Sequence, residues 1–152
     1  MNHIKNIDVK GIELICKYEG FSSNPYSCPA GVPTIGYGTT RYPNGVRVRL
    51  SDKAISEPVA KEFLRRNMAQ YEQGVDALTI DSITQNQFNA LVSFAYNVGV
   101  QALRGSTLLK KVNANPNDKA ITAEFMKWNK GGGKVLAGLT RRRAEEAKLY
   151  FS

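Results

Sequence analysis

Three residues with complementary chemistry lie close together in the N-terminal part of the chain. Glu19 is directly followed by Gly20, Cys28 lies nine positions after the acid, and Thr34 opens an alternating segment. A carboxylic acid that holds its proton can protonate a leaving oxygen, and a thiolate can act as a base or a nucleophile. Glycoside hydrolysis needs an acid on one side of the bond and a second group across it. Residues 20–51 contain no Asp or Glu, so Cys28 becomes the candidate for the second role. On spacing alone the signal is weak, because a lone buried cysteine is more often a small apolar side chain.

A helix must position Glu19. The segment from Asp8 to the residue before Gly20 is expected to be helical, because Asp8 is a good N-cap and glycine is favoured just past a helix end. Its apolar face has helical spacing and runs into the acid through Ile12, Ile15, Cys16 and Glu19. An acid on a buried face loses hydration, which favours its neutral form. The alternative is a salt-bridged acid at a helix end, although a carboxylate there opposes the helix dipole.

A short strand must position Thr34. Residues 21–33 are rich in Ser, Asn, Pro and Gly, and we expect them to form a loop or an irregular strand. Residues 34–42 then alternate as a strand does, with Thr34, Gly36 and Gly38 on one face. Two glycines on that face suit the close approach of a ligand or, alternatively, mark a bulge or a tight bend.

A hairpin is expected directly after this strand. Asn44-Gly45 is a strong hairpin signal, and residues 46–50 read as the partner strand. In that strand the residues expected to point inward are Val46, Val48 and Leu50. The sequence therefore predicts a small antiparallel sheet of two or three strands.

Helices are expected from there to the C-terminus, over residues 57–77, 85–98, 106–112, 118–128 and 139–151. The first would span about 30 Å at 1.5 Å per residue, enough to join two lobes. A capping box, Thr84 with Gln87, precedes the second, which is apolar on more than one side and reads as the central core helix. Gly131-Gly132-Gly133 is expected to be a flexible break.

This pattern predicts an α+β fold in a single domain over residues 1–152. A small N-terminal antiparallel sheet would lie in a lobe over about residues 20–55. A larger helical lobe would cover about residues 75–152 together with the N-terminal helix. A chain of 152 residues is one domain by the usual size prior.

The formal net charge of +8 suggests a polyanionic partner: nucleic acid, an anionic membrane surface or an anionic cell-wall polymer. The alternative is that the charge serves solubility alone. Residues 1–11 lack the apolar region of a signal peptide, and no segment is apolar enough for a membrane anchor. From this we expect no stable membrane association.

Several site types are disfavoured by composition. The single histidine, His3, is expected to be solvent-exposed, so a Ser-His-Asp or Cys-His site is improbable. No residues have metal-ligand spacing, and we predict no metal and no cofactor. Cys16 and Cys28 are expected to be free thiols, although a disulfide between them is geometrically conceivable and would disable the site.

The residues also resemble a known family, the phage-type lysozymes or endolysins of glycoside hydrolase family 24. The family signature is Glu, eight residues, Asp or Cys, five residues, and Thr, which Glu19, Cys28 and Thr34 match. Further stretches that resemble the family are TIGYGTT, TQNQFNALVSFAYNVG, STLLKKVN and GGGKVLAGLTRRRAEE. The resemblance spans nearly the whole chain. Cys28 is the rarer choice at its position, and many relatives have His where Thr39 stands.

The resemblance implies a two-lobed lysozyme-like fold and a muramidase that cuts the β-1,4 bond between N-acetylmuramic acid and N-acetylglucosamine. Glu19 would be the general acid, Cys28 the base or nucleophile, and Thr34 would assist. Substrate-binding residues near the family's cleft would be Gly38, Tyr96 and Thr107. For Tyr96 the alternative is core packing, and for Thr107 a helix cap.

Peptidoglycan is the partner that the resemblance implies, rather than nucleic acid, and the enzyme would be a monomer. It would accumulate in the host cytoplasm and act on the cell wall after a separate membrane-permeabilising protein releases it. Arg141, Arg142 and Arg143 would contact the wall or pair with acids near the cleft.

Two rival classes remain: a lytic transglycosylase or chitin-cleaving enzyme on the same scaffold, and a non-catalytic basic protein that binds cell wall or nucleic acid.

Overall fold

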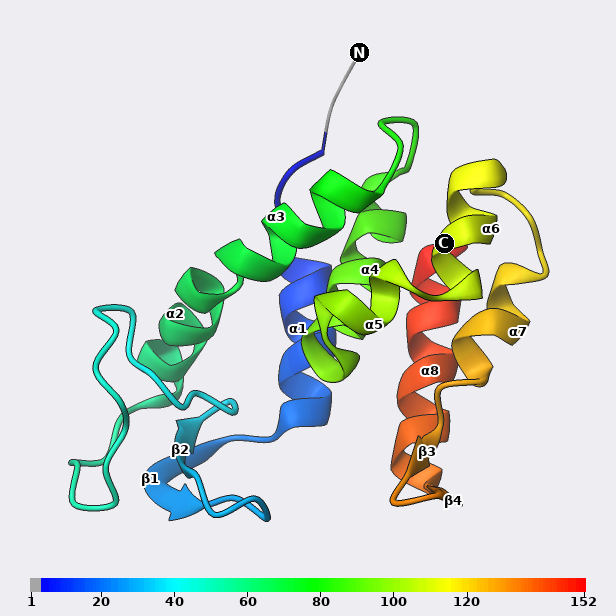
Figure 1. Ribbon diagram of the computed structural model, residues 1–152. Helices are drawn as coiled ribbons and strands as arrows, with labels where there is room; N and C mark the ends of the chain where they lie inside the picture. The colour runs from blue at the N-terminus through cyan, green and yellow to red at the C-terminus, as the bar shows by residue number, and fades with distance from the viewer. Residues whose placement is uncertain (1–3) are drawn as a thin grey trace. The chain divides into compact units, whose positions relative to one another are not determined.

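The computed structural model describes residues 4–152 (Figure 1), so His3 lies outside the described residues. The helices are α1 Val9–Glu19, α2 Glu57–Asn67, α3 Ala69–Leu78, α4 Gln85–Val98, α5 Val100–Arg104, α6 Thr107–Ala114, α7 Ile121–Met126 and α8 Ala137–Tyr150. The strands are β1 Ser22–Ser27, β2 Pro33–Gly36, β3 Lys130–Gly131 and β4 Lys134–Val135. Helices with two small antiparallel sheets confirm the predicted α+β class. Within the described residues, no helix combines the length and apolar character needed to cross a membrane.

The chain divides into two compact units. The sheet unit is Ile15–Ala69. The helical unit comprises Gln70–Ser152 and the N-terminal segment through Leu14. The division falls inside α1, so this helix begins in the helical unit and ends in the sheet unit.

The first helix forms as the sequence predicts. The Asp8 carboxylate accepts a hydrogen bond from the Lys10 amide at 3.1 Å, which caps the start of α1. At the other end Gly20 adopts φ 72°, and its amide donates to the Cys16 carbonyl at 3.1 Å. The predicted apolar face, Ile12, Ile15 and Cys16, is buried.

The sheet of the sheet unit differs from the expected one. β2 pairs with β1, the segment expected to be a loop or an irregular strand, with Tyr26 opposite Thr34 and Ser27 opposite Pro33. The pairing is irregular between Ser22 and Tyr26. The loop-like composition of β1 therefore reflects a short, irregular strand.

The expected strand over residues 46–50 is wrong, although the turn before it is present. The Tyr42 amide donates to the Val46 carbonyl at 2.9 Å, and the Gly45 amide donates to the Tyr42 carbonyl at 2.8 Å. Beyond this turn only isolated bridges form. Val48 is buried, but Val46 and Leu50 are 53% and 58% exposed. The alternating apolar residues therefore do not form one buried face.

The single helix expected over residues 57–77 is present as two helices. Between them Met68 lies in a turn, and its amide donates to the Arg65 carbonyl three residues back, the tighter pattern of a 3₁₀ turn. Met68 is fully buried, and the Asn67 side-chain amide donates to the Arg41 carbonyl at 3.0 Å. These contacts interrupt the helix without Gly or Pro.

The central core helix of the helical unit, α4, has the predicted bounds. Both bonds of the capping box are present: the Gln87 amide donates to the Thr84 hydroxyl at 3.1 Å, and the Thr84 amide donates to the Gln87 side chain at 2.9 Å. Gly99, with φ 97°, ends the helix. α8 packs against α4 and α7 (Figure 1).

Several boundaries in the last third of the chain differ from expectation. The glycine run forms the turn of a β3–β4 hairpin, with Gly132 and Gly133 at positive φ, and is not a loose break. The helix expected over residues 118–128 is limited to α7, and α5 was not expected. α8 begins two residues earlier than predicted, at Ala137.

Candidate active site

Glu19 is the last residue of α1 and is half-buried. The left-handed turn at Gly20 leads directly into β1. Between them the Phe21 ring packs against the buried ring of Tyr37, with centroids 5.5 Å apart. This contact links the end of the helix, next to the candidate acid, to the turn that follows β2.

Cys28 lies at the start of the tight connection between β1 and β2. Its amide donates to the Val32 carbonyl at 3.1 Å, and its carbonyl accepts from the Gly31 amide at 2.8 Å. Gly31 adopts φ 80°, which a glycine tolerates without strain. The loop therefore holds the Cys28 backbone at both its amide and its carbonyl, and the side chain is half-buried.

Hydrogen bonds to the sulfur lower the pKa of the Cys28 thiol below its ordinary value. The backbone of Val32 contributes most, followed by the backbone of Ala30. Desolvation acts in the opposite direction and raises the pKa, while the Thr34 hydroxyl and the amide of Cys28 itself lower it further. Donors aimed at the sulfur stabilise the thiolate over the thiol, which is the form that acts as base or nucleophile.

Thr34, in β2, is buried beside this loop. Its hydroxyl donates to the Val32 carbonyl at 2.9 Å and also hydrogen-bonds the Cys28 side chain. A hydroxyl has one proton to donate, so the carbonyl and the sulfur compete for it. When Cys28 is a thiolate, the Thr34 hydroxyl donates most favourably to the sulfur. When Cys28 is a neutral thiol, the hydroxyl can donate to the Val32 carbonyl instead.

The glycines after Thr34 form a tight bend. This was the alternative to a strand face open to a ligand. Gly36 and Gly38 have φ values of 64° and 81°, and Ile35 and Thr39 exchange two backbone hydrogen bonds of 2.9 Å. A Cβ on Gly36 would lie 3.0 Å from the Cβ of Ala60 in α2. Gly36 is therefore covered by α2, and the expectation that it faces a ligand is wrong.

Tyr37 anchors this bend, and sequence reasoning missed it. The pKa of Tyr37 is raised to about 12, first by burial and then by a hydrogen bond to the Glu57 side chain. Glu57 is the first residue of α2. The bend is thus held to the start of α2 by a polar contact between the buried Tyr37 and the exposed Glu57.

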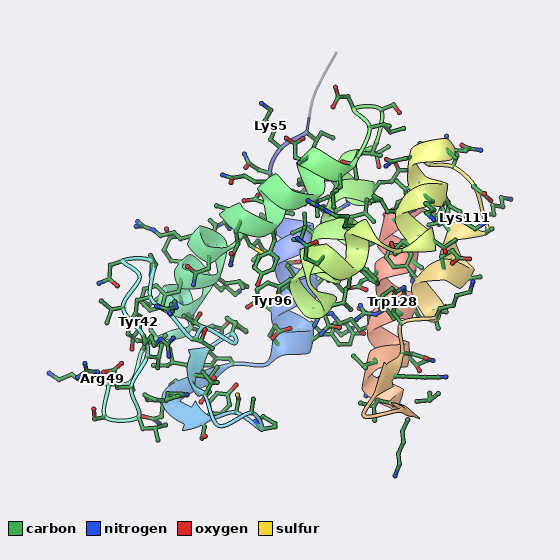
Figure 2. All side chains as sticks on the ribbon, viewed as in Figure 1. Lys5, Tyr42, Arg49, Tyr96, Lys111 and Trp128 are labelled. Atoms are coloured by element: carbon green, nitrogen blue, oxygen red, sulfur yellow. The ribbon has the colours of Figure 1, made fainter. Side chains whose placement is uncertain are left out.

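The remaining candidates, Tyr96 and Thr107, belong to the helical unit. The Tyr96 ring packs edge-on against Tyr71 with centroids 5.1 Å apart, and Figure 2 labels it at the end of α4. Thr107 is exposed at the start of α6. The helix cap is Ser106, whose hydroxyl accepts from the Leu109 amide at 3.0 Å, so the capping alternative for Thr107 is wrong.

Two of the three arginines expected to contact the wall or to pair with acids near the cleft are core residues. Arg142 and Arg143 are buried and both pair with the buried carboxylate of Glu146, Arg142 at 3.3 Å. The Arg143 guanidinium also donates to the Trp128 carbonyl at 2.9 Å. Arg141 alone of the three is exposed. Direct wall contact by Arg142 and Arg143 is therefore wrong, because both guanidinium groups are buried inside the helical unit and paired with Glu146.

Across residues 4–152, no three His, Cys, Asp or Glu side chains lie close enough to hold a metal ion. The sheet unit contains Glu19, Cys28, Thr34 and Gly38, and it brings Cys28 and Thr34 into hydrogen-bond contact. At the candidate positions it carries the carboxyl group of Glu19 and the thiol of Cys28, with the Thr34 hydroxyl as the partner of the thiol.

Comparisons with known proteins place the chain in a family. A family model described as phage lysozyme matches residues 16–146. The endolysin of Bacillus phage B103 is 44% identical over 147 residues, which cover 97% of this chain but only 54% of that protein. The chain therefore spans about half the length of that relative.

Solved structures show the same fold over nearly the whole chain. The endolysin from Escherichia coli O157:H7 phage FAHEc1 superposes with a TM-score of 0.89 at 34% identity, covering 99% of this chain and 96% of that one. A mutant of P22 lysozyme gives a TM-score of 0.87 at 31% identity, covering 98% and 100%. These matches confirm the expected lysozyme-like fold. The chain belongs to the phage lysozyme family.

Proposed function

We propose that this chain is an endolysin muramidase that hydrolyses the β-1,4 bond between N-acetylmuramic acid and N-acetylglucosamine in bacterial peptidoglycan and so lyses the host cell. The observation that carries the proposal is the hydrogen-bonded pair of Cys28 and Thr34, in which backbone amides lower the pKa of the thiol. The pair stands at the second and third signature positions of the family, and Glu19 stands at the first.

Glu19 is the general acid in this mechanism. Its carboxyl group donates a proton to the glycosidic oxygen as the bond to C1 breaks, which avoids release of an alkoxide. Positive charge then develops on C1 and the ring oxygen. A negatively charged group on the opposite face of the sugar stabilises that charge.

The Cys28 thiolate supplies the second group in one of two ways. As a nucleophile it attacks C1 to form a thioglycoside, which water hydrolyses while Glu19 accepts a proton, and the configuration is retained. As a base it takes a proton from a water that attacks C1, and the configuration is inverted. In both cases the Thr34 hydroxyl donates to the anionic sulfur and returns to the Val32 carbonyl when the sulfur becomes neutral.

The products of purified peptidoglycan test this function. The proposal expects fragments with ordinary reducing N-acetylmuramic acid ends, identified by mass spectrometry. Ends that are 1,6-anhydro, one water lighter, would instead identify a lytic transglycosylase. Cleavage of chitin at the same rate as peptidoglycan would contradict specificity for the muramic acid bond. Binding to peptidoglycan without any cleavage products would favour the non-catalytic wall-binding protein. NMR of the first-formed anomer separates retention from inversion.

Gly38, Tyr96 and Thr107 are proposed to contact the glycan. Thr107 offers the simplest test, because its side chain is exposed. Thr107→Ala is expected to raise KM while leaving kcat unchanged, as loss of uniform binding does. An unchanged KM on soluble peptidoglycan fragments would remove Thr107 from the site.

The route to the substrate is part of the proposal. The enzyme is proposed to accumulate in the host cytoplasm and to reach the wall when a separate protein opens the inner membrane. Expression of the chain with and without a membrane-permeabilising protein tests this route. Lysis by the chain expressed alone would contradict it.

A further inference from the structure

A small basic hollow lies on the sheet unit, outside the three candidate catalytic residues. We call it the arginine hollow. It has a volume of about 220 Å³, smaller than the roughly 300–1,000 Å³ of pockets that enclose a drug-sized ligand. Its lining residues are Val32, Pro33, Thr40, Arg41, Arg47 and Val48.

The two arginines of this hollow face each other across an antiparallel bridge. Arg41 and Arg47 are direct partners in that bridge, so their side chains leave the same face of the ribbon. Like charges in directly opposite positions destabilise a ribbon. Across residues 4–152, neither guanidinium forms an ion pair with a carboxylate. The pair therefore carries an uncompensated charge that a bound anion would relieve.

The acid of the neighbouring loop is already engaged elsewhere. The Asp52 carboxylate accepts from the Tyr42 hydroxyl at 2.6 Å and from the Arg49 amide at 2.9 Å. These bonds lower the pKa of Asp52, with the Tyr42 contact first. The side chain of Arg49 extends outward from this loop (Figure 2), so it is not part of the hollow.

The backbone beneath the arginines is held in place. The Val48 amide donates to the Thr40 carbonyl at 2.9 Å, and Val48 is buried. One nitrogen of Arg41 donates to the Gly45 carbonyl at 3.1 Å, which fixes that side chain across the turn. Arg47 is exposed, and its charged end is available to a ligand.

We propose that the arginine hollow binds a phosphate group, and that its natural ligand is a phosphodiester of an anionic cell-wall polymer. A planar carboxylate has two oxygens, and the guanidinium group of a single arginine can bind both. A tetrahedral phosphate can offer oxygens to two guanidinium groups from different directions at once. The Thr40 hydroxyl is a third donor on the rim.

This site would tether the polymer beside the Cys28 loop. Val32 lines the hollow, and its carbonyl also accepts from the Cys28 amide and the Thr34 hydroxyl. The proposal does not depend on glycosidase activity, and its test reads binding alone. Its failure is therefore distinguishable from failure of the proposed function.

Phosphate titration followed by NMR of the arginine side-chain N–H signals tests the site. Saturable shifts of the Arg41 and Arg47 signals are expected at constant ionic strength. Arg47→Gln is expected to weaken binding by up to about fivefold, the order of one exposed charged contact. Arg65→Gln removes the same charge from α2 of the same unit and is the matched control, with affinity unchanged. Arg47→Lys keeps the charge but loses the forked guanidinium group. Its affinity for phosphate is expected to lie between those of Arg47→Gln and Arg65→Gln.

Further ligands separate the sources of phosphate and the rival explanations. A soluble glycerol-phosphate oligomer is expected to bind more tightly than inorganic phosphate, since several diesters can use the same site; binding by inorganic phosphate alone would overturn the polymer assignment. Equal shifts with chloride or acetate would show general screening and overturn the phosphate site. Equal losses for Arg47→Gln and Arg65→Gln would do the same.

Discussion

Cys28 owes its lowered pKa to backbone amides rather than to a neighbouring cation. The Val32 and Ala30 contributions come first, and the Thr34 hydroxyl is the side-chain contribution. This arrangement favours the thiolate form without a histidine, which is consistent with a candidate site that contains none. It also makes Thr34 a positioning residue whose effect can be read at the sulfur.

Thr34→Val should raise the pKa of the Cys28 thiol, because it removes a donor that stabilises the thiolate. The pH profile of Cys28 alkylation should therefore shift to higher pH, and the rising limb of the pH–activity profile should shift with it. Cys16→Ala in both proteins removes the second thiol from the measurement. Thr34→Ser should keep the parental midpoint. An unshifted midpoint in Thr34→Val would show that the hydroxyl stays on the Val32 carbonyl and does not act on the sulfur.

Substitution of Cys28 tests its chemical role. Cys28→Ser should lose most activity, because a hydroxyl with an ordinary pKa is a far weaker base and nucleophile than a thiolate. Cys28→Asp should keep part of it, because an anionic group remains at the position. The rate of turbidity loss of cell-wall suspensions measures both variants. Equal activity in all three proteins would make Cys28 a structural residue.

At the scale of elements, the packing of α2 on β2 depends on the absence of a side chain at Gly36. Gly36→Ala would add a Cβ 3.0 Å from Ala60 at φ 64°. The left-handed backbone costs about 1–2 kcal/mol for a residue with a Cβ, and overpacking adds about 1–3 kcal/mol. Gly45 has φ 87° and open space around an added Cβ. Gly45→Ala is therefore expected to have the cost of the left-handed backbone but not that of overpacking. Urea unfolding should rank Gly36→Ala as the less stable variant, and equal stabilities would refute the close packing.

The α4–α8 interface depends on Glu146. Its carboxylate accepts from the Ser93 hydroxyl at 2.6 Å and pairs with Arg142 and Arg143. Glu146→Gln leaves two buried guanidinium groups without an anion and should cost about 3–5 kcal/mol of unfolding free energy. Glu62→Gln, which breaks an exposed pair with Arg66, should cost at most about 1 kcal/mol. Similar losses for the two variants would contradict the buried cluster.

Elements with local signals were predictable from the sequence, and those fixed by tertiary contacts were not. α4 has a capping box at its start and Gly99 at its end, so both bounds could be read. No Gly or Pro marks the break at Met68, which follows from burial of that side chain and from the Asn67 contact with Arg41. The Val-Arg alternation over residues 46–50 is typical of a strand, but Val46 and Leu50 stay more than half exposed.

At the scale of the whole molecule, all three candidate catalytic residues lie in the sheet unit. Their spacing, and the position of Glu19 in line with the apolar face of its helix, could be predicted from the sequence. Both depend only on residues that are close together along the chain. The amides that act on Cys28 could not be read, because they depend on the fold of residues 28–32. Arg142 and Arg143 were expected to contact the wall or to pair with acids near the cleft. Their burial could not be read, because their hydrogen-bond network includes Ser93, which is distant in sequence.

Glu19→Gln tests the central claim, acid catalysis by this residue, most directly. Glutamine keeps the size and hydrogen-bonding capacity of the side chain but has no proton to transfer, and loss of a general acid typically slows a reaction by about 100-fold to 10,000-fold. The proposed function predicts a clearing rate for cell-wall suspensions at least about 100-fold below the parental rate. An unchanged thermal unfolding midpoint would show that the variant is folded. Clearing at the parental rate by the folded variant, with the same products, would contradict acid catalysis by Glu19.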